Sequence, residues 1–177
     1  MQSGERSECR ASLNAWAVEP DEHLLEVGCG PGVAVQLVCQ QLANGTITAI
    51  DRSATMVARA RQRNHAHVVA GRARIELRTL ADADFGERSL GTAFTKAFAI
   101  NVNAFWTAPA PSFAAARRLL GADGTLFLVY EPPSAERLRS LRRQLRLLLP
   151  AYGFRVGDER VRDVGQGRAV CVVGHPT

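Results

Sequence analysis

Short apolar runs alternate with helical patterns along this chain, and no other feature of the sequence restricts the fold as strongly. Helical segments or loops are expected between the apolar runs, and several of the helical segments end at a glycine. Strands that alternate with helices form a parallel sheet, so we expect helices on both of its faces. The first five strands are predicted at residues 24–27, 46–50, 74–78, 92–100 and 125–131.

The end of the chain departs from this alternation. Two further strands are predicted between Gly153 and Gly174, joined by a tight turn at Gly165-Gln166-Gly167. A parallel crossover needs about a dozen residues or more, so this last pair must be antiparallel. We therefore predict an α/β fold: a single doubly wound, mostly parallel seven-stranded sheet with helices on both faces and an antiparallel last strand.

The length of 177 residues fits one domain with a sizeable core. We expect a single domain over residues 1–177, with an N-terminal helix and linker at 1–20 and the α/β core at 21–177. Within that core, helices are predicted from Gly32 to Ala43, from Ser53 to Gly71, near residues 81–90 and at 112–120, where Gly121 ends the last one. An Asp123-Gly124 turn should precede the fifth strand.

The helix after that strand has the clearest apolar stripe. It is predicted to begin at Ser134, and its leucines recur at helical spacing: Leu138, Leu141, Leu145 and Leu148. Its arginines fall on other sides of the helix, and we interpret them as a solvated face: Arg137, Arg139, Arg142, Arg143 and Arg146.

Composition sets the broad class of the protein. The net charge of +5 comes from 21 arginines and the single lysine Lys96 against 17 acids, a bias typical of GC-rich genomes, and we expect a bacterial source. The sequence shows neither a membrane-spanning apolar run nor a secretory signal, so a cytoplasmic location is expected. The four cysteines lack metal spacing, and His65 and His67 lie on different sides of a predicted helix, so no metal site is predicted.

The stretch "LLEVGCGPG", residues 24–32, ends the first strand in a glycine-rich turn. A phosphate-binding P-loop would need a lysine close to this turn, and none is present. A dinucleotide fingerprint would place glycine at position 33, where the chain has Val33. Glu26 would also repel a pyrophosphate, whereas it would attract an amino group or a sulfonium cation.

These residues resemble the first motif of class I S-adenosylmethionine-dependent methyltransferases, which have a seven-stranded Rossmann-like sheet with an antiparallel last strand. The stretch "AIDRSATMV" is similar to the acidic second motif of that family. The segment "AFAINVNAFWTAP" resembles the end of strand four in its small-molecule members. The resemblance covers roughly residues 20–174 and implies S-adenosylmethionine as the cofactor.

The resemblance also implies which residues bind this cofactor. The turn from Gly28 to Gly32, including Cys29, Gly30 and Pro31, would pass close to the methionine part, with Glu26 near the amino group. Asp51 would accept hydrogen bonds from the ribose hydroxyls, and Arg52 and Met56 would flank the adenine.

The adenine amino group would be recognised in the loop after the third strand. Counting forward from "RIELR" places Ala81 at the position where the family has an acid, whereas counting back from Phe94 places Asp82 there. We choose Asp82. Asn101, at the end of the fourth strand, completes the expected cofactor site.

The acceptor should lie beyond the carboxyl ends of the fourth and fifth strands. The expected contacts are Asn103, Phe105, Trp106 and Tyr130. No general base is evident among them, which favours an acceptor that ionises easily. The proposed partner is a small organic acceptor, methylated by in-line displacement.

Three alternatives stay open at this point. The chain could methylate RNA with its arginine-rich helix, although the motifs for amino-methylation of adenine and for carbon-5 methylation of pyrimidines are absent. It could also be a homologue that binds the cofactor without catalysis, or a partner subunit in an oligomer.

Overall fold

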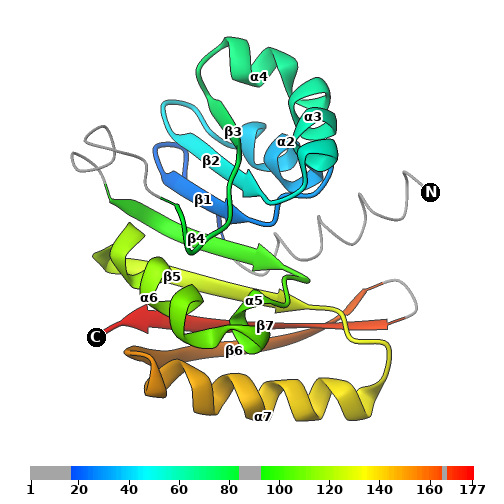
Figure 1. Cartoon of the computed structure of the whole chain (residues 1–177), viewed down its shortest axis with the longest axis vertical. Helices are drawn as coiled ribbons and strands as arrows, with labels where there is room; N and C mark the ends of the chain where they lie inside the picture. The colour runs from blue at the N-terminus through cyan, green and yellow to red at the C-terminus, as the bar shows by residue number, and fades with distance from the viewer. Residues whose placement is uncertain (1–16, 84–92, 165–166) are drawn as a thin grey trace.

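The computed structural model describes residues 17–83, 93–164 and 167–177, and these residues build one seven-stranded sheet (Figure 1). The strand order is β3-β2-β1-β4-β5-β7-β6. The strands are β1 His23–Val27, β2 Thr46–Asp51, β3 Ala73–Leu77, β4 Phe94–Ile100, β5 Leu120–Tyr130, β6 Phe154–Val164 and β7 Gly167–Pro176.

The first five strands are parallel, and β7 runs antiparallel to both β5 and β6. This confirms the predicted α/β fold with an antiparallel last strand. Strand β1 lies between β2 and β4, so the chain leaves β1 toward one edge and later returns to its other side. At such a reversal the loops after the two neighbouring strands separate, which leaves a crevice at their carboxyl ends.

Helices cover both faces of this sheet, as predicted. One core cluster packs α5, α6 and α7 on one face, and the other packs α2 and α3 on the opposite face. The helices are α2 Val33–Cys39, α3 Ala54–Arg63, α4 His65–Val69, α5 Ala104–Thr107, α6 Pro109–Leu119 and α7 Ala135–Ala151. The short helix expected near 81–90 and the N-terminal helix lie largely outside the described residues.

Two helix predictions need correction. The single helix expected from Ser53 to Gly71 is divided at Asn64 into α3 and α4. In α7 the fourth buried leucine is Leu149, whereas Leu148 is only partly buried. Ser53 and Ser134 are N-caps as predicted, since their hydroxyls accept from the backbone N–H groups of Met56 and Arg137 at 3.4 and 3.2 Å.

The start of the fifth strand was also predicted wrongly. Strand β5 begins at Leu120, directly after α6, and Leu120 pairs with Phe94. The next pair joins Thr125 to Lys96, so four residues on β5 correspond to one on β4. Asp123 and Gly124 therefore lie in an irregular, bulged part of the strand instead of a separate turn.

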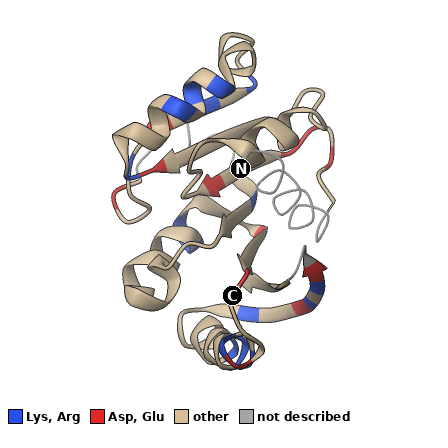
Figure 2. Cartoon of the chain, turned by 90° about the vertical axis from the view of Figure 1, so that its right-hand side faces the viewer, with Lys and Arg blue, Asp and Glu red and all other residues tan. Residues whose placement is uncertain are grey.

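Charged residues are unevenly placed on this frame. Figure 2 shows blue Lys and Arg segments gathered on the helix near the top of the view and on the one at its base, which are α3 and α7. In the part of the chain that the structure describes, none of the helices combines the length and apolar character that crossing a membrane requires.

Candidate cofactor and acceptor site

The glycine-rich turn and the loop after β4 meet at the carboxyl ends of the two central strands. Gly28, Gly30 and Gly32 all have left-handed backbone conformations, with φ of 72°, 51° and 78°. A Cβ on Gly28 would lie 2.5 Å from Val102 Cγ2 in the loop after β4. Glycine at position 28 thus lets these two loops pack together.

Gly32 and Gly30 differ in what surrounds them. A Cβ on Gly32 would lie 2.9 Å from Ala60 Cα, so this glycine lets α3 approach the turn. A Cβ on Gly30 would meet no described atom within 4 Å. Gly30 is therefore the glycine of this turn that borders open space, and the one where a ligand can approach the backbone closely.

Asp51, at the end of β2, fixes the turn from the side. Its Oδ2 accepts a hydrogen bond from the Gly30 backbone N–H at 2.9 Å, and its Oδ1 accepts one from Ser53 N–H at 2.8 Å. An ionised carboxylate has about four acceptor positions, so two remain for other donors. Asp51 can thus shape the turn and still bind hydroxyl groups of a ligand.

Glu26 is a buried acid beneath the same turn. It is 3% exposed, and its Oε2 is buried without a hydrogen-bond partner among the described residues. Burial, with a smaller contribution from the charge of Asp51, raises the pKa of its carboxyl from 4.5 to about 8. A buried carboxyl with an orphaned oxygen is satisfied by a cationic donor, and an amino group is one.

Cys29 and Pro31 complete the glycine-rich turn. Cys29 is buried, and its Sγ donates to the Gly30 carbonyl at 3.7 Å. Burial, and then the charges of Glu26 and Asp51, raise the pKa of this thiol well above its usual range, so it stays a neutral thiol. Pro31 is half-buried next to it.

Asn64 supports the turn from the α3–α4 break and escaped the sequence analysis. This buried side chain donates from Nδ2 to the carbonyls of Gly32 and Ala60, both at 2.9 Å. It thereby ties the end of the turn to α3. The available signal was a single asparagine within a helical pattern, since asparagine hydrogen-bonds neighbouring backbone and weakens helices.

A hollow of about 590 Å³ lies beside the ends of β2 and β3, and both Arg52 and Asp82 line it. Asp82 is exposed, and its Oδ2 accepts from the Thr79 hydroxyl at 2.6 Å. Arg52 is exposed and has no partner in the described ranges. Met56 is half-buried in the first turn of α3 and does not line this hollow.

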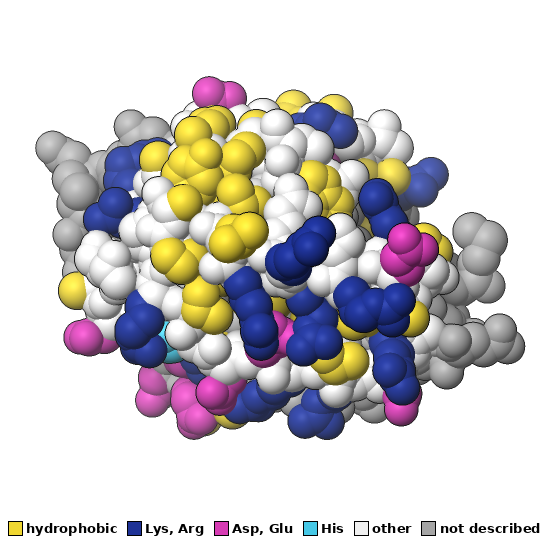
Figure 3. All heavy atoms as spheres, turned by 90° about the horizontal axis from the view of Figure 1, so that it is seen from below, with side chains coloured by type: hydrophobic (Ala, Val, Ile, Leu, Met, Phe, Trp, Pro, Cys, Tyr) yellow, Lys and Arg dark blue, Asp and Glu magenta, His cyan; other side chains and the backbone are white. Residues whose placement is uncertain are grey.

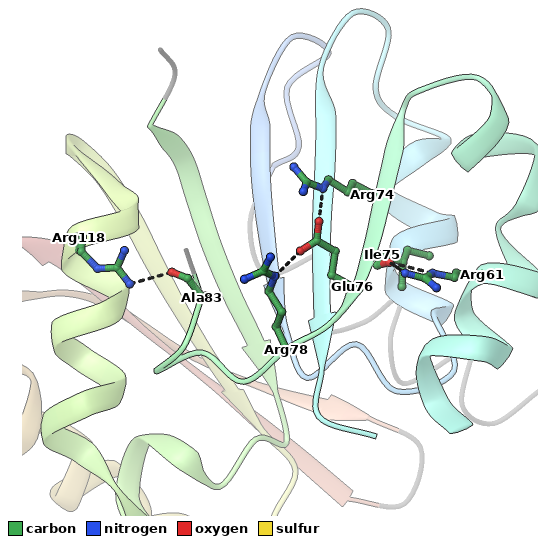
Figure 4. A network of polar contacts seen from close by, with 7 residues as sticks. All are labelled: Arg61, Arg74, Ile75, Glu76, Arg78, Ala83 and Arg118. Atoms are coloured by element: carbon green, nitrogen blue, oxygen red, sulfur yellow. Dashed lines mark hydrogen bonds and ion pairs between the residues drawn. The ribbon is translucent and has the colours of Figure 1, made fainter. Parts of the chain in front are cut away.

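Three polar residues that line this hollow, Arg61, Glu76 and Arg78, already bind other protein groups, as Figure 4 shows. Arg61 donates to the carbonyl of Ile75 at 2.9 and 2.7 Å. Glu76 pairs with both Arg74 and Arg78. Arg52 therefore remains available to contact a ligand, and Asp82 has one carboxylate oxygen engaged by Thr79 and the other without a hydrogen bond among the described residues.

A pocket of about 490 Å³ lies at the ends of β4 and β5, next to α7. It is lined by Asn101, Asn103, Trp106 and Tyr130, all singled out from the sequence. The Asn101 backbone has a left-handed φ of 57°, and its Oδ1 accepts from the Glu131 N–H at 2.8 Å. This hydrogen bond connects the two strand ends that form the floor of the pocket.

Phe105 is a correction to the predicted acceptor site. It is fully buried and packs edge-on against Phe113, with ring centroids 5.2 Å apart. Neighbouring residues on a helix point about 100° apart, and on the short helix α5 Trp106 lines the pocket while Phe105 enters the core.

The α7 wall of the same pocket was missed by the sequence analysis. It consists of Arg137, Ser140, Leu141 and Gln144. Their spacing of three, four and seven residues places them on one helix face. Arg137 is exposed, as predicted for the solvated face, and it also borders the pocket. The remaining arginines lie around a shallower hollow, and Figure 3 shows dark-blue side chains grouped on that side of the molecule.

Comparison with known proteins identifies the family. The model of the family described as "Methyltransferase domain" matches residues 25–126, more than half of the chain. The chain therefore belongs to this family, in the class I group of S-adenosylmethionine-dependent methyltransferases. The family resemblance and the cofactor class inferred from the sequence are confirmed.

One curated relative shares a short segment with the chain. The trans-aconitate 2-methyltransferase of Delftia acidovorans is 50% identical over 40 residues. These residues are 23% of this chain and span only 15% of the relative's length.

Solved structures share the fold at low sequence identity. The magnesium protoporphyrin IX methyltransferase of Synechocystis, solved with S-adenosylmethionine, has a TM-score of 0.71 at 15% identity, over 99% of this chain and 81% of its own. A geranyl diphosphate methyltransferase in complex with the same cofactor has a TM-score of 0.73 at 12% identity, over 98% and 86%. The [4+2]-cyclase SpnF has a TM-score of 0.77 at 18% identity, over 99% and 83%. The fold is thus common to enzymes with different named activities.

Proposed function

We propose that this chain transfers a methyl group from S-adenosylmethionine to a small organic acceptor. The observation that carries the proposal is Glu26, a buried carboxyl with an unpartnered oxygen under a turn of left-handed glycines. A ligand with an amino group near a cationic centre would satisfy this carboxyl, and Gly30 borders the space in which such a ligand could lie. A pyrophosphate would add negative charge to the same place.

The residues around this space fit the remaining parts of the cofactor. Asp51 keeps two acceptor positions for ribose hydroxyls. Arg52 and Met56 would flank the adenine, and Asp82 would accept from its amino group. Asn101 would border the cofactor on the β4 side.

The turn itself has a positioning role. Gly28, Cys29, Pro31 and Gly32 shape the backbone through their contacts with the β4 loop and α3, and the Asn64 amide fixes its end. A pre-shaped turn lowers the entropy cost of binding, because little needs to be ordered when the ligand arrives.

S-adenosylmethionine supplies a methyl group on a sulfonium sulfur, which keeps the electron pair of the broken carbon–sulfur bond. The chain contributes orientation of the two reactants at the ends of β4 and β5. Tyr130 is no general base, because burial raises the pKa of its phenol far above neutral and its hydroxyl donates to the Val102 carbonyl at 2.7 Å. An acceptor that is already ionised fits this pocket best.

The pocket size supports a small acceptor, because about 490 Å³ is within the range of small-molecule sites. Two of the similar proteins are named for the methylation of trans-aconitate and of geranyl diphosphate, which are small molecules. A bacterial origin and a cytoplasmic location belong to the same proposal. A second copy of the chain could complete the acceptor site.

A methyl-transfer assay tests the proposal. The chain is incubated with S-adenosylmethionine labelled at the methyl group and a panel of small acids, phenols, thiols and amines, with RNA as a further arm. We expect label in a small acceptor, together with an equal amount of S-adenosylhomocysteine. Label in RNA would favour the arginine-helix alternative, and cofactor binding without any transfer would favour a non-catalytic homologue.

A further inference from the structure

The pocket at the ends of β4 and β5 has a flat aromatic wall that is held in place. Trp106 stacks on Tyr130 with ring centroids 4.6 Å apart and planes tilted by 32°. Tyr130 is 2% exposed, and its hydroxyl is fixed to the Val102 carbonyl. Because Trp106 is half-buried and lines the pocket, its indole provides a fixed planar contact surface.

Another part of the pocket lining is polar and solvent-exposed, and it comes from one face of α7. Ser140 and Gln144 stand on successive turns of this face, with Arg137 one turn before them. A planar guanidinium with hydroxyl and amide groups beside it suits the binding of a carboxylate. This wall therefore differs in chemistry from the aromatic one, and a ligand that fills the pocket has to match both.

The charge of Arg137 has no counterpart among the described residues. Two other arginines of α7, Arg142 and Arg146, both pair with Glu159 on β6. No acid of the described chain pairs with Arg137 in this way. Glu131 also lines the pocket, but it has a further interaction within the protein in addition to its backbone bond to Asn101.

We propose that this pocket binds a small organic anion: a carboxylate on a planar, unsaturated body. Arg137 binds the carboxylate, and Trp106 contacts the planar part. A neutral ligand would make no ion pair with the guanidinium, so the anion should be preferred over its neutral analogue. The inference rests on the proposed function for the role of this ligand as methyl acceptor, whereas binding itself does not depend on catalysis.

The test compares a matched pair of probes, trans-cinnamate and its neutral amide, by ligand-observed NMR on the full chain. We expect cinnamate to bind about tenfold more tightly than cinnamamide or better. Arg137→Gln should remove this preference. Arg143→Gln, on the same helix but away from the pocket, should keep it. Trp106→Leu should weaken both probes alike.

Two results would overturn the inference. One is equal affinity for acid and amide, or no saturable binding of cinnamate up to about 10 mM. The other is an acid preference that persists in Arg137→Gln, with unchanged melting temperatures showing that the variants fold. S-adenosylhomocysteine is titrated into the same samples. Its binding without an acid preference contradicts this inference alone, whereas an acid preference without its binding contradicts the proposed function alone.

Discussion

We propose that Glu26 couples cofactor binding to the release of a proton. In the free protein the pKa of its carboxyl is about 8, so the group is mostly protonated at pH 7. A bound amino group would stabilise the ionised form and lower that pKa, so binding should release a proton. We expect the affinity for S-adenosylhomocysteine to increase by up to about tenfold per pH unit between pH 6 and 7.5. Above this range the amino group of the ligand itself begins to lose its proton.

Calorimetry in buffers of different ionisation enthalpy measures this proton directly. The wild-type chain should release close to one proton at pH 6.5, and Glu26→Gln should release none while binding more weakly. Absence of proton release from the wild type, or equal release from the variant, would exclude Glu26 as the group that binds the amino function.

The same carboxyl affects the stability of the free protein. Its pKa is raised from 4.5 to about 8 on folding, so the folded chain holds a proton that the unfolded chain loses. The free energy of unfolding should therefore decrease as the pH rises from about 4.5 to about 8, by on the order of 5 kcal/mol. An amino group of the bound cofactor would stabilise the ionised carboxyl and so offset this loss of stability. A buried acid is therefore better tolerated at a ligand site than elsewhere in the core.

At the scale of helices and strands, Glu159 connects α7 to β6. Its carboxylate is 8% exposed and pairs with Arg142 and with Arg146 Nε at 2.8 Å. We expect Glu159→Gln to lower the free energy of unfolding by about 1–2 kcal/mol, because two arginines lose their charged partner. Chemical denaturation monitored by circular dichroism measures this change.

The neighbouring Asp158 is a matched control. Its side chain is 78% exposed and pairs with Arg160 at 3.4 Å. Asp158→Asn should change the free energy of unfolding by less than about 0.5 kcal/mol. Equal effects of the two substitutions would show that burial of the Glu159 carboxylate does not stabilise the contact between α7 and β6.

The seven strands, their mostly parallel arrangement and the antiparallel last strand were predictable, because apolar runs, connection lengths and a tight final turn allow few topologies. Local choices were not. A stripe of helical spacing fits Leu148 and Leu149 alike, and the choice depends on Gly174 in β7, where an added Cβ would lie 2.7 Å from Leu149 Cδ2. The bulge at Asp123-Gly124 likewise depends on its pairing with β4.

The candidate site was predictable in its motif and less so in its walls. The glycine turn, Glu26 and Asp51 are close in sequence to the strands that position them. The α7 wall is contributed by a helix that follows β5. Neither periodicity nor composition reveals that Arg137 borders the pocket at the ends of β4 and β5 while Arg143 lies beside a different hollow. Such a distinction requires the relative placement of α5 and α7.

At the scale of the whole molecule, the sheet reversal between β1 and β4 brings together the space beside Gly30, proposed for the cofactor, and the pocket proposed for the acceptor. Gly28 and Val102 contact each other at that reversal, and Asn101 is one residue away. The two sites thus share the loop after β4, as a transfer reaction between two bound molecules requires.

The central claim is that the space beside Gly30 binds S-adenosylmethionine. Gly30→Asn fills this space with a side chain that tolerates the left-handed backbone, whereas Gly71→Asn makes the same change at φ 70°, also in open space but after α4. The most direct measurement is calorimetric titration of S-adenosylhomocysteine, with NADH as a control ligand, into the wild type and both variants. The account predicts binding to the wild type and Gly71→Asn, at least about a hundredfold weaker binding to a folded Gly30→Asn, and none of NADH. Equal binding to all three chains, or binding of NADH in place of S-adenosylhomocysteine, would contradict it.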